Sequence, residues 1–171
     1  VSGGKLASYF SIRDDNCGRY MDELDATAKS LIWEVNRIHS QGAGTKLFDY
    51  AQGQQGVQNS TVPLGSAQTV LPDADKIQAG NVNFYFYDKT TGNYASSGLL
   101  DFDSATAGVQ NFDPAVHSLD DVVGAINNTF PTQLSASVQD GRLVITSAAG
   151  SNLQFALGTD STGMMAALGI N

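Results

Sequence analysis

The sequence contains a single cysteine, Cys17, among its 171 residues. A lone cysteine forms no disulfide within the chain and provides no Cys-based zinc site. Apolar runs are short, and none approaches the roughly 18 residues that a membrane-spanning helix needs. The glycine patterns that cradle phosphates and the nucleophile pattern G-x-S-x-G are missing. These absences argue against a disulfide-stapled domain, a membrane span and the common nucleotide-binding or hydrolase sites.

Basic residues are also scarce. Nine Lys and Arg stand against 17 Asp and Glu, which gives a formal net charge of -8. Such a chain repels phosphate backbones and releases no counterions on contact, so nucleic acid is excluded as a partner. The imbalance lies in residues 67–171, with three basic and ten acidic side chains. We expect this second part to be an acidic, outward-facing body.

Proline is absent between Leu6 and His39, and Gly18 is the only interior glycine, so the sequence predicts an unusually long helix. Residues at mostly three- and four-residue spacing predict one seam along it. At 1.5 Å per residue the helix would extend roughly 50 Å, longer than a small domain is wide. We therefore predict that the seam packs in a bundle or coiled coil rather than only on its own domain. The seam residues are Phe10, Cys17, Tyr20, Leu24, Ala28, Leu31, Val35 and Ile38.

The composition predicts three regions and an α+β fold. Residues 1–41 form the long amphipathic helix of an incomplete helical-bundle domain. Residues 42–66 are rich in glycine and glutamine, which predicts a connector held by a few anchors such as Leu47 and Phe48. From residue 67 the apolar period changes to two, which predicts a mainly antiparallel β domain over 67–171 with one or two short helices.

Local signals place several elements within this β domain. Alternation of Val82, Phe84 and Phe86 predicts a strand, and the turn residues 88–93 that follow it predict a hairpin turn. Asp140-Gly141 between alternating runs predicts a tight hairpin, because both residues tolerate positive φ. Further predicted elements are a helix opened by Ser118 with Asp120 and Asp121 in its first turn, a strand at Leu153–Leu157, and a short helix at Thr162–Leu168.

Patterns that could carry chemistry are weak. Asp73-x-Asp75 and Asp101-x-Asp103 place carboxylates at alternate positions, as calcium loops do, but neither continues to a third ligand. The two histidines, His39 and His117, lie in different predicted regions and form no local metal or triad pattern. We predict no catalytic, cofactor-binding or metal site.

Two stretches resemble flagellar proteins. Ala125-Ile-Asn-Asn-Thr-Phe, a short spacer and Leu134–Ala148 resemble the flagellin hook IN motif, a short helix ending in Ile-Asn before a strand-turn-strand unit. Gly3-Gly-Lys-Leu-Ala, Arg13-Asp-Asp and the helix Leu24–His39 resemble the family of bacterial flagellar hook-associated protein 1, the hook-filament junction proteins. Residues 67–117 match only loosely. The IN-motif residues are Ile126, Asn127, Phe130, Leu134, Val138, Asp140, Gly141, Leu143 and Ile145.

The resemblance implies a structural component of the flagellum and not an enzyme. Its long helix would join the bundle that builds the axial tube, and the acidic domain would project outward. The implied location is extracellular, after flagellar export. The implied partners are the hook protein, neighbouring hook-associated proteins and further copies of the chain, with no cofactor and no small-molecule substrate. Because Val1–Lys5 has neither an initiator Met nor a signal-peptide layout, we expect an internal segment of a longer chain.

Other interpretations stay open. The IN motif by itself also fits a flagellin or a filament cap protein. A secreted adhesin or glycan-binding module could use exposed tyrosines near Tyr85, Tyr87 and Tyr94, and binding on a glycan array that Tyr→Ala changes abolish would favour it. A carboxylate-based glycosidase would need two carboxyl groups about 5–10 Å apart in a cleft.

Overall fold

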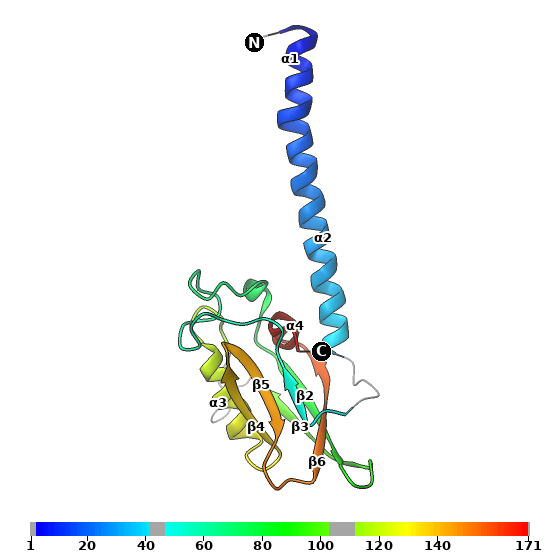
Figure 1. The fold of residues 1–171 in the computed structure, drawn as a ribbon, viewed down its shortest axis with the longest axis vertical. Coiled ribbons are helices and arrows are strands. Elements are labelled where there is room, and N and C mark those ends of the chain that lie inside the picture. The colour runs from blue at the N-terminus through cyan, green and yellow to red at the C-terminus, as the bar shows by residue number, and fades with distance from the viewer. Residues whose placement is uncertain (1–2, 42–46, 103–111, 171) are drawn as a thin grey trace. The chain divides into compact units, whose positions relative to one another are not determined.

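A computed structural model describes residues 3–41, 47–102 and 112–170 of the chain. Clustering of contacts divides the chain into two compact units, Val1–Val35 and Asn36–Asn171. The first unit is helical, and the second holds all of the described strands. The predicted α+β class, a long N-terminal helix followed by antiparallel sheets and short helices, is confirmed (Figure 1).

The predicted long helix forms, but one turn of it is wound differently. It consists of α1 (Gly4–Ser11), a π-helical segment (Ile12–Asn16) and α2 (Cys17–Ser40). Hydrogen bonds in a π-helix span one residue more than in an α-helix, so this segment rotates α1 about the helix axis relative to α2. The seven-residue step from Phe10 to Cys17 therefore does not keep both on one line. The seam is regular only along α2.

The second unit contains two antiparallel three-stranded sheets, ordered β3-β2-β6 and β1-β5-β4. The end of α2, two further α-helices and a 3-10 turn complete the described part of it, and Figure 1 shows α3 beside the β4–β5 hairpin. The strands are β1 (Tyr50–Gln52), β2 (Asn81–Asp88), β3 (Tyr94–Asp101), β4 (Leu134–Gln139), β5 (Arg142–Ser147) and β6 (Leu153–Asp160). The helical elements are η2 (Ala74–Lys76), α3 (Leu119–Thr129) and α4 (Met164–Leu168).

The core of this unit follows from alternation on the strands. Every second residue of β2 is buried, from Val82 through Phe84 to Phe86, as the sequence predicted. Phe130, at the end of α3, lies against two of these rings, with centroid distances of 5.2 Å to Phe84 and 5.5 Å to Phe86. Phe155 of β6 adds a further ring, 6.4 Å from that of Phe84. One aromatic cluster thus joins the sheet β3-β2-β6 to α3.

Both predicted hairpin turns are present. Asp140 and Gly141 have φ of 50° and 73°, the positive values that a two-residue turn between β4 and β5 requires. The turn after β2 is held by the Asp88 carboxylate, which accepts hydrogen bonds from the backbone N–H groups of Thr90 (3.0 Å) and Thr91 (2.8 Å). These bonds keep the pKa of Asp88 below its usual value.

The structure differs from the predicted connector at 42–66. Phe48 pairs with Phe155 through two backbone hydrogen bonds of 2.8 and 2.9 Å, and β1 pairs with β5. Leu64 is almost fully buried. The described residues from 47 to 66 thus belong to the second unit, which begins at Asn36 and not at residue 67. The glycines that predicted a connector do not prevent a segment from pairing when its partners are strands far along the chain.

Candidate assembly surfaces

The seam on α2 is exposed. Leu24 and Leu31 have 69% and 64% of their surface accessible, and every other predicted seam residue is exposed as well. Between Cys17 and Ile38 the helix is regular, so the three- and four-residue spacing aligns their side chains along one side. An isolated exposed leucine needs no explanation, but an aligned series of them is typical of a helix that packs against others.

Charged residues lie on the opposite side of α2. Asp22 and Lys29 lie seven residues apart there, about half a turn away from Leu24 and Leu31 in helical geometry, and both are exposed. Arg19 and Glu23 form an ion pair of 3.6 Å one turn apart on the helix. Trp33, one turn after Lys29 on this side, is buried, so charged residues and one buried aromatic share the side opposite the seam.

The residues that resemble the IN motif fold into one compact helix-hairpin unit. Its helix, α3, begins with a capping box, in which the Ser118 hydroxyl accepts from the Asp121 N–H (3.3 Å) and the Asp121 carboxylate accepts from the Ser118 N–H (2.8 Å). The latter bond is the main reason that the pKa of Asp121 lies below its usual value. The structure buries Ile126, Phe130, Leu134, Leu143 and Ile145 and leaves Val138 half-buried.

Asn127 closes the free edge of β4, a role that the sequence did not reveal. β4 is the end strand of its sheet. The Asn127 amide donates to the Ala136 carbonyl at 2.9 Å, and its oxygen accepts from the Ala136 N–H at 2.7 Å. One side chain thus bonds to both backbone groups of Ala136, as a neighbouring strand would. Ile126 fills the core while Asn127 fixes the helix to the hairpin.

Replacing Asn127 with aspartate is expected to destabilise this unit by about 1–3 kcal/mol at neutral pH, because a carboxylate then faces the Ala136 carbonyl that needs a donor. The exposed neighbour Asn128 is the control, since Asn128→Asp adds the same charge to the same helix turn. Urea unfolding of both variants measures the difference between their free energies of unfolding. A protonated carboxyl can donate again, so the difference in stability should shrink as pH falls through the raised folded pKa of the new carboxyl toward the unfolded value of about 3.9. Equal stabilities at pH 7 would contradict the role of Asn127.

Gly141 is required by its contact as well as by its φ. A Cβ at this position would lie 2.1 Å from the Val57 carbonyl oxygen, and the Val57 N–H donates to the Gly141 carbonyl at 2.8 Å. The hairpin turn is therefore held against residues 84 positions earlier in the chain. The Asp-Gly pair predicted the turn, but nothing local predicted this contact.

Asp160 is a buried carboxylate that the sequence analysis did not single out. One oxygen accepts from the N–H groups of Thr162 (2.8 Å) and Gly163 (3.1 Å) and from the Thr162 hydroxyl, and the other accepts from the Met165 N–H (2.9 Å). Burial raises the pKa of Asp160 above its usual value, although these hydrogen bonds act in the opposite direction. The carboxylate satisfies backbone donors at the start of α4 and so holds that helix at the end of β6.

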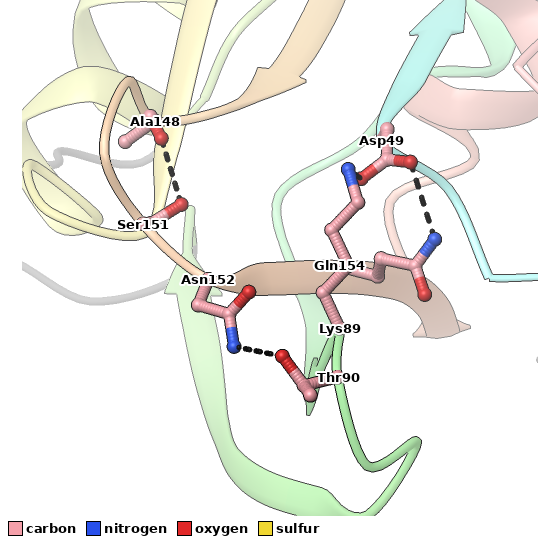
Figure 2. Close-up of polar contacts among 7 residues, drawn as sticks. All are labelled: Asp49, Lys89, Thr90, Ala148, Ser151, Asn152 and Gln154. Carbon is pink, nitrogen blue, oxygen red and sulfur yellow. Dashed lines mark hydrogen bonds and ion pairs between the residues drawn. The ribbon is translucent and has the colours of Figure 1, made fainter.

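A polar cluster connects the start of β1 to the turn after β2 and to β6. The Asp49 carboxylate accepts from the Lys89 ammonium (2.8 Å) and from the Gln154 amide (3.2 Å), as Figure 2 shows. Asn152 donates to the Thr90 hydroxyl at 2.9 Å. The hydrogen bond from Lys89 is the main reason that the pKa of Asp49 is lowered. These side chains satisfy one another's hydrogen-bonding groups and connect the three segments.

The weaker sequence patterns are not brought together. Asp73 pairs with Lys76 at 2.7 Å, and Asp103 lies outside the described residues. The His117 ring stacks on Phe112 at 5.4 Å, and His39 is an exposed residue of α2. Among residues 3–41, 47–102 and 112–170, no group of three or more His, Cys, Asp or Glu side chains could hold a metal ion. No described helix is long and apolar enough to cross a membrane.

No model of a known protein family matches the chain, and no curated protein matches it. The function proposed for this chain therefore rests on its own residues: the exposed seam of α2 and the helix-hairpin unit around Asn127.

Proposed function

We propose that this chain is a structural part of a bacterial flagellum at the junction of hook and filament, where it acts through contacts between subunits. The exposed seam of α2 carries the proposal. Seven residues at helical spacing, from Cys17 to Ile38, are exposed. The partners proposed for them are helices of further copies and of neighbouring hook-associated proteins.

The gain from covering the seam is large for so few side chains. Burying apolar surface is worth roughly 25 cal/mol per Å², and a leucine or isoleucine contributes about 1.5–3 kcal/mol when it is fully buried. Leu24, Leu31 and Ile38 are each more than half exposed, so most of this gain is still available. Packing of such a seam between helices needs no bond chemistry, and the flagellar role proposed here is one of assembly.

The helix-hairpin unit supports the flagellar assignment over an unrelated coiled-coil protein. Its sequence resembles the IN motif, and the two residues that give the motif its name have separate structural tasks, Ile126 in the core and Asn127 at the edge of β4. This unit fits a flagellin or a cap protein equally well. The choice of the junction protein depends on the resemblance of Gly3–His39.

The seam can be tested with Leu24→Gln and Leu31→Gln together, in a bacterium whose own copy of the gene is deleted. Glutamine has nearly the helix propensity of leucine, so the change removes apolar contact and keeps the helix. We expect hooks without attached filaments under the electron microscope, and loss of swimming. The purified variant should unfold within about 0.5 kcal/mol of the parent, because both leucines are exposed.

Asp22→Asn with Lys29→Gln is the matched control, since it changes two exposed residues on the other side of the same helix. This variant should restore filaments. Normal filaments in the leucine variant would refute a role for the seam in assembly. Normal filaments in cells without the gene would refute the junction assignment as a whole.

A further inference from the structure

The outer face of the sheet β3-β2-β6 carries three tyrosines. The inner face of β2 is buried, whereas the alternate residues Asn83, Tyr85 and Tyr87 are partly exposed on the other side. A register shift between Phe86 and Tyr87 pairs Tyr87 with Tyr94 of β3, so the two tyrosines lie on the same face. Their rings meet edge to face, with centroids 5.9 Å apart. Tyr85, Tyr87 and Tyr94 are called the tyrosine face below.

The Tyr85 ring lies against Gly158 of β6, a position that has no side chain. A Cβ at Gly158 would lie 2.4 Å from Tyr85 Cε2 and 3.2 Å from Cδ2. The ring therefore occupies the space that a side chain at position 158 would fill, and it stays partly exposed. The residues paired with Tyr85 are small, Ser97 on β3 and Ala156 on β6.

Polar groups border the tyrosine face on two sides. On one side the Tyr94 hydroxyl donates to the Ser97 hydroxyl at 3.1 Å, and Tyr94 is 58% exposed. On the other side Gln154 is the register partner of Tyr87, and its amide reaches the Asp49 carboxylate, which Lys89 also contacts (Figure 2). Hydroxyl, amide, carboxylate and ammonium groups thus surround aromatic rings within a few residues.

We propose that the tyrosine face binds a neutral glycan. The face of an aromatic ring is electron-rich and attracts the C–H groups on one side of a sugar ring, which carry a partial positive charge. The polar border supplies donors and acceptors for sugar hydroxyls. Tyr85 and Tyr87 are two residues apart on a strand, about 7 Å, so one glycan of several sugar rings can contact both.

The charge of the chain selects among glycans. Residues 67–171 carry three basic and ten acidic side chains, and Lys89 beside the tyrosine face is already paired with Asp49. An anionic glycan, sialylated or sulfated, would be repelled and would find no free cation among these border residues. Neutral glycans meet no such cost. The proposal does not depend on the flagellar role, because it involves the sheet and not the seam of α2.

The test begins with the whole 171-residue chain on an array of neutral, sialylated and sulfated glycans, followed by calorimetric titration of the neutral glycan that binds best. Tyr85→Ala and Tyr94→Ala should each weaken binding about tenfold or more, as loss of an aromatic anchor does. Gly158→Ala should also weaken it, because the new Cβ displaces the Tyr85 ring and removes no tyrosine. Tyr50→Ala is the matched control, an exposed tyrosine on the other sheet, and should bind as the parent does.

Thermal unfolding of each variant separates lost binding from lost folding, and a folded variant with weaker binding supports the proposal. Three results would overturn it: no neutral glycan bound at millimolar concentration, binding that Tyr85→Ala and Tyr94→Ala leave unchanged, or binding restricted to anionic glycans. None of these results would affect the filament test of the seam, so the two proposals fail separately.

Discussion

Replacing Phe155 with alanine is expected to lower the free energy of unfolding by about 3–5 kcal/mol. Its side chain is fully buried between two other rings, 5.9 Å from that of Phe48 and 6.4 Å from that of Phe84. Its backbone pairs on one side with Phe86 of β2 and on the other with Phe48. The substitution leaves a cavity where β2, β6 and the segment before β1 meet.

Urea unfolding followed by circular dichroism measures this loss. Leu99→Ala is the control, because Leu99 is a large apolar residue of the same sheet that is 46% exposed. Its cost should stay near 0.5 kcal/mol, as for most surface substitutions. A Phe155→Ala variant as stable as the Leu99→Ala variant would show that the aromatic cluster is not the core of the second unit.

The elements that the sequence predicted correctly are those whose signals are local. Asp140-Gly141 predicts a turn because the two residues accept positive φ wherever they occur. Ser118 and Asp121 predict a helix start because both capping bonds join residues three positions apart. The alternation in β2 predicts its buried side for the same reason. In each case the free energy that selects the structure comes from groups within a few residues.

The features that the sequence did not predict depend on distant partners. The strand β1 lies in a glycine-rich stretch and forms because β5, more than 90 residues later, offers an edge. The task of Asn127 depends on where β4 passes, and the contact of Gly141 depends on Val57. The π-helical segment also went unpredicted, since the heptad spacing of Phe10 and Cys17 gave no sign of it, but its side-chain hydrogen bonds and ring contact are local.

The candidate surfaces show the same division. Spacing alone selected the seam from Cys17 to Ile38, because helical geometry fixes which side chains align. The tyrosines were recognised as a possible binding group from composition and alternation. That the Tyr85 ring lies against Gly158 depends on the pairing of β2 with β6 and on its register shift between Val82 and Phe84. Pairing of strands more than 60 residues apart carries no signal in a single sequence.

Replacing Asp160 with alanine is expected to cost about 3–5 kcal/mol, since it leaves buried donors unpaired at the start of α4. The affected N–H groups belong to Thr162, Gly163 and Met165, and Asp160 itself is 1% exposed. Asp160→Asn keeps the shape of the side chain and one acceptor oxygen. If the amide oxygen faces Thr162 and Gly163, only the hydrogen bond from the Met165 N–H is lost. Its cost should be about 1–3 kcal/mol.

The difference in free energy of unfolding between the parent and Asp160→Asn depends on pH, and this dependence distinguishes the role of the charge of Asp160 from that of its shape. Burial holds the folded-state pKa of Asp160 above its unfolded value of about 3.9. Its contribution to stability is therefore complete below that value and declines as pH rises through the folded pKa. The free energy of unfolding of the parent should therefore exceed that of the Asp160→Asn variant by more at pH 3 than at pH 7.

Other carboxyls act in the opposite direction but cancel in this comparison. The pKa values of Asp49, Asp88 and Asp121 are lowered, so their contribution is present above the unfolded pKa and is lost as pH falls. Both proteins should therefore lose stability in acid through these three groups, and the difference between them isolates Asp160. If the difference in free energy of unfolding between the parent and the Asn variant widens as pH rises, the hydrogen bonds lower the pKa of Asp160 by more than burial raises it. In that case the carboxylate would be stabilised by its donors as an anion, and α4 would depend on its negative charge.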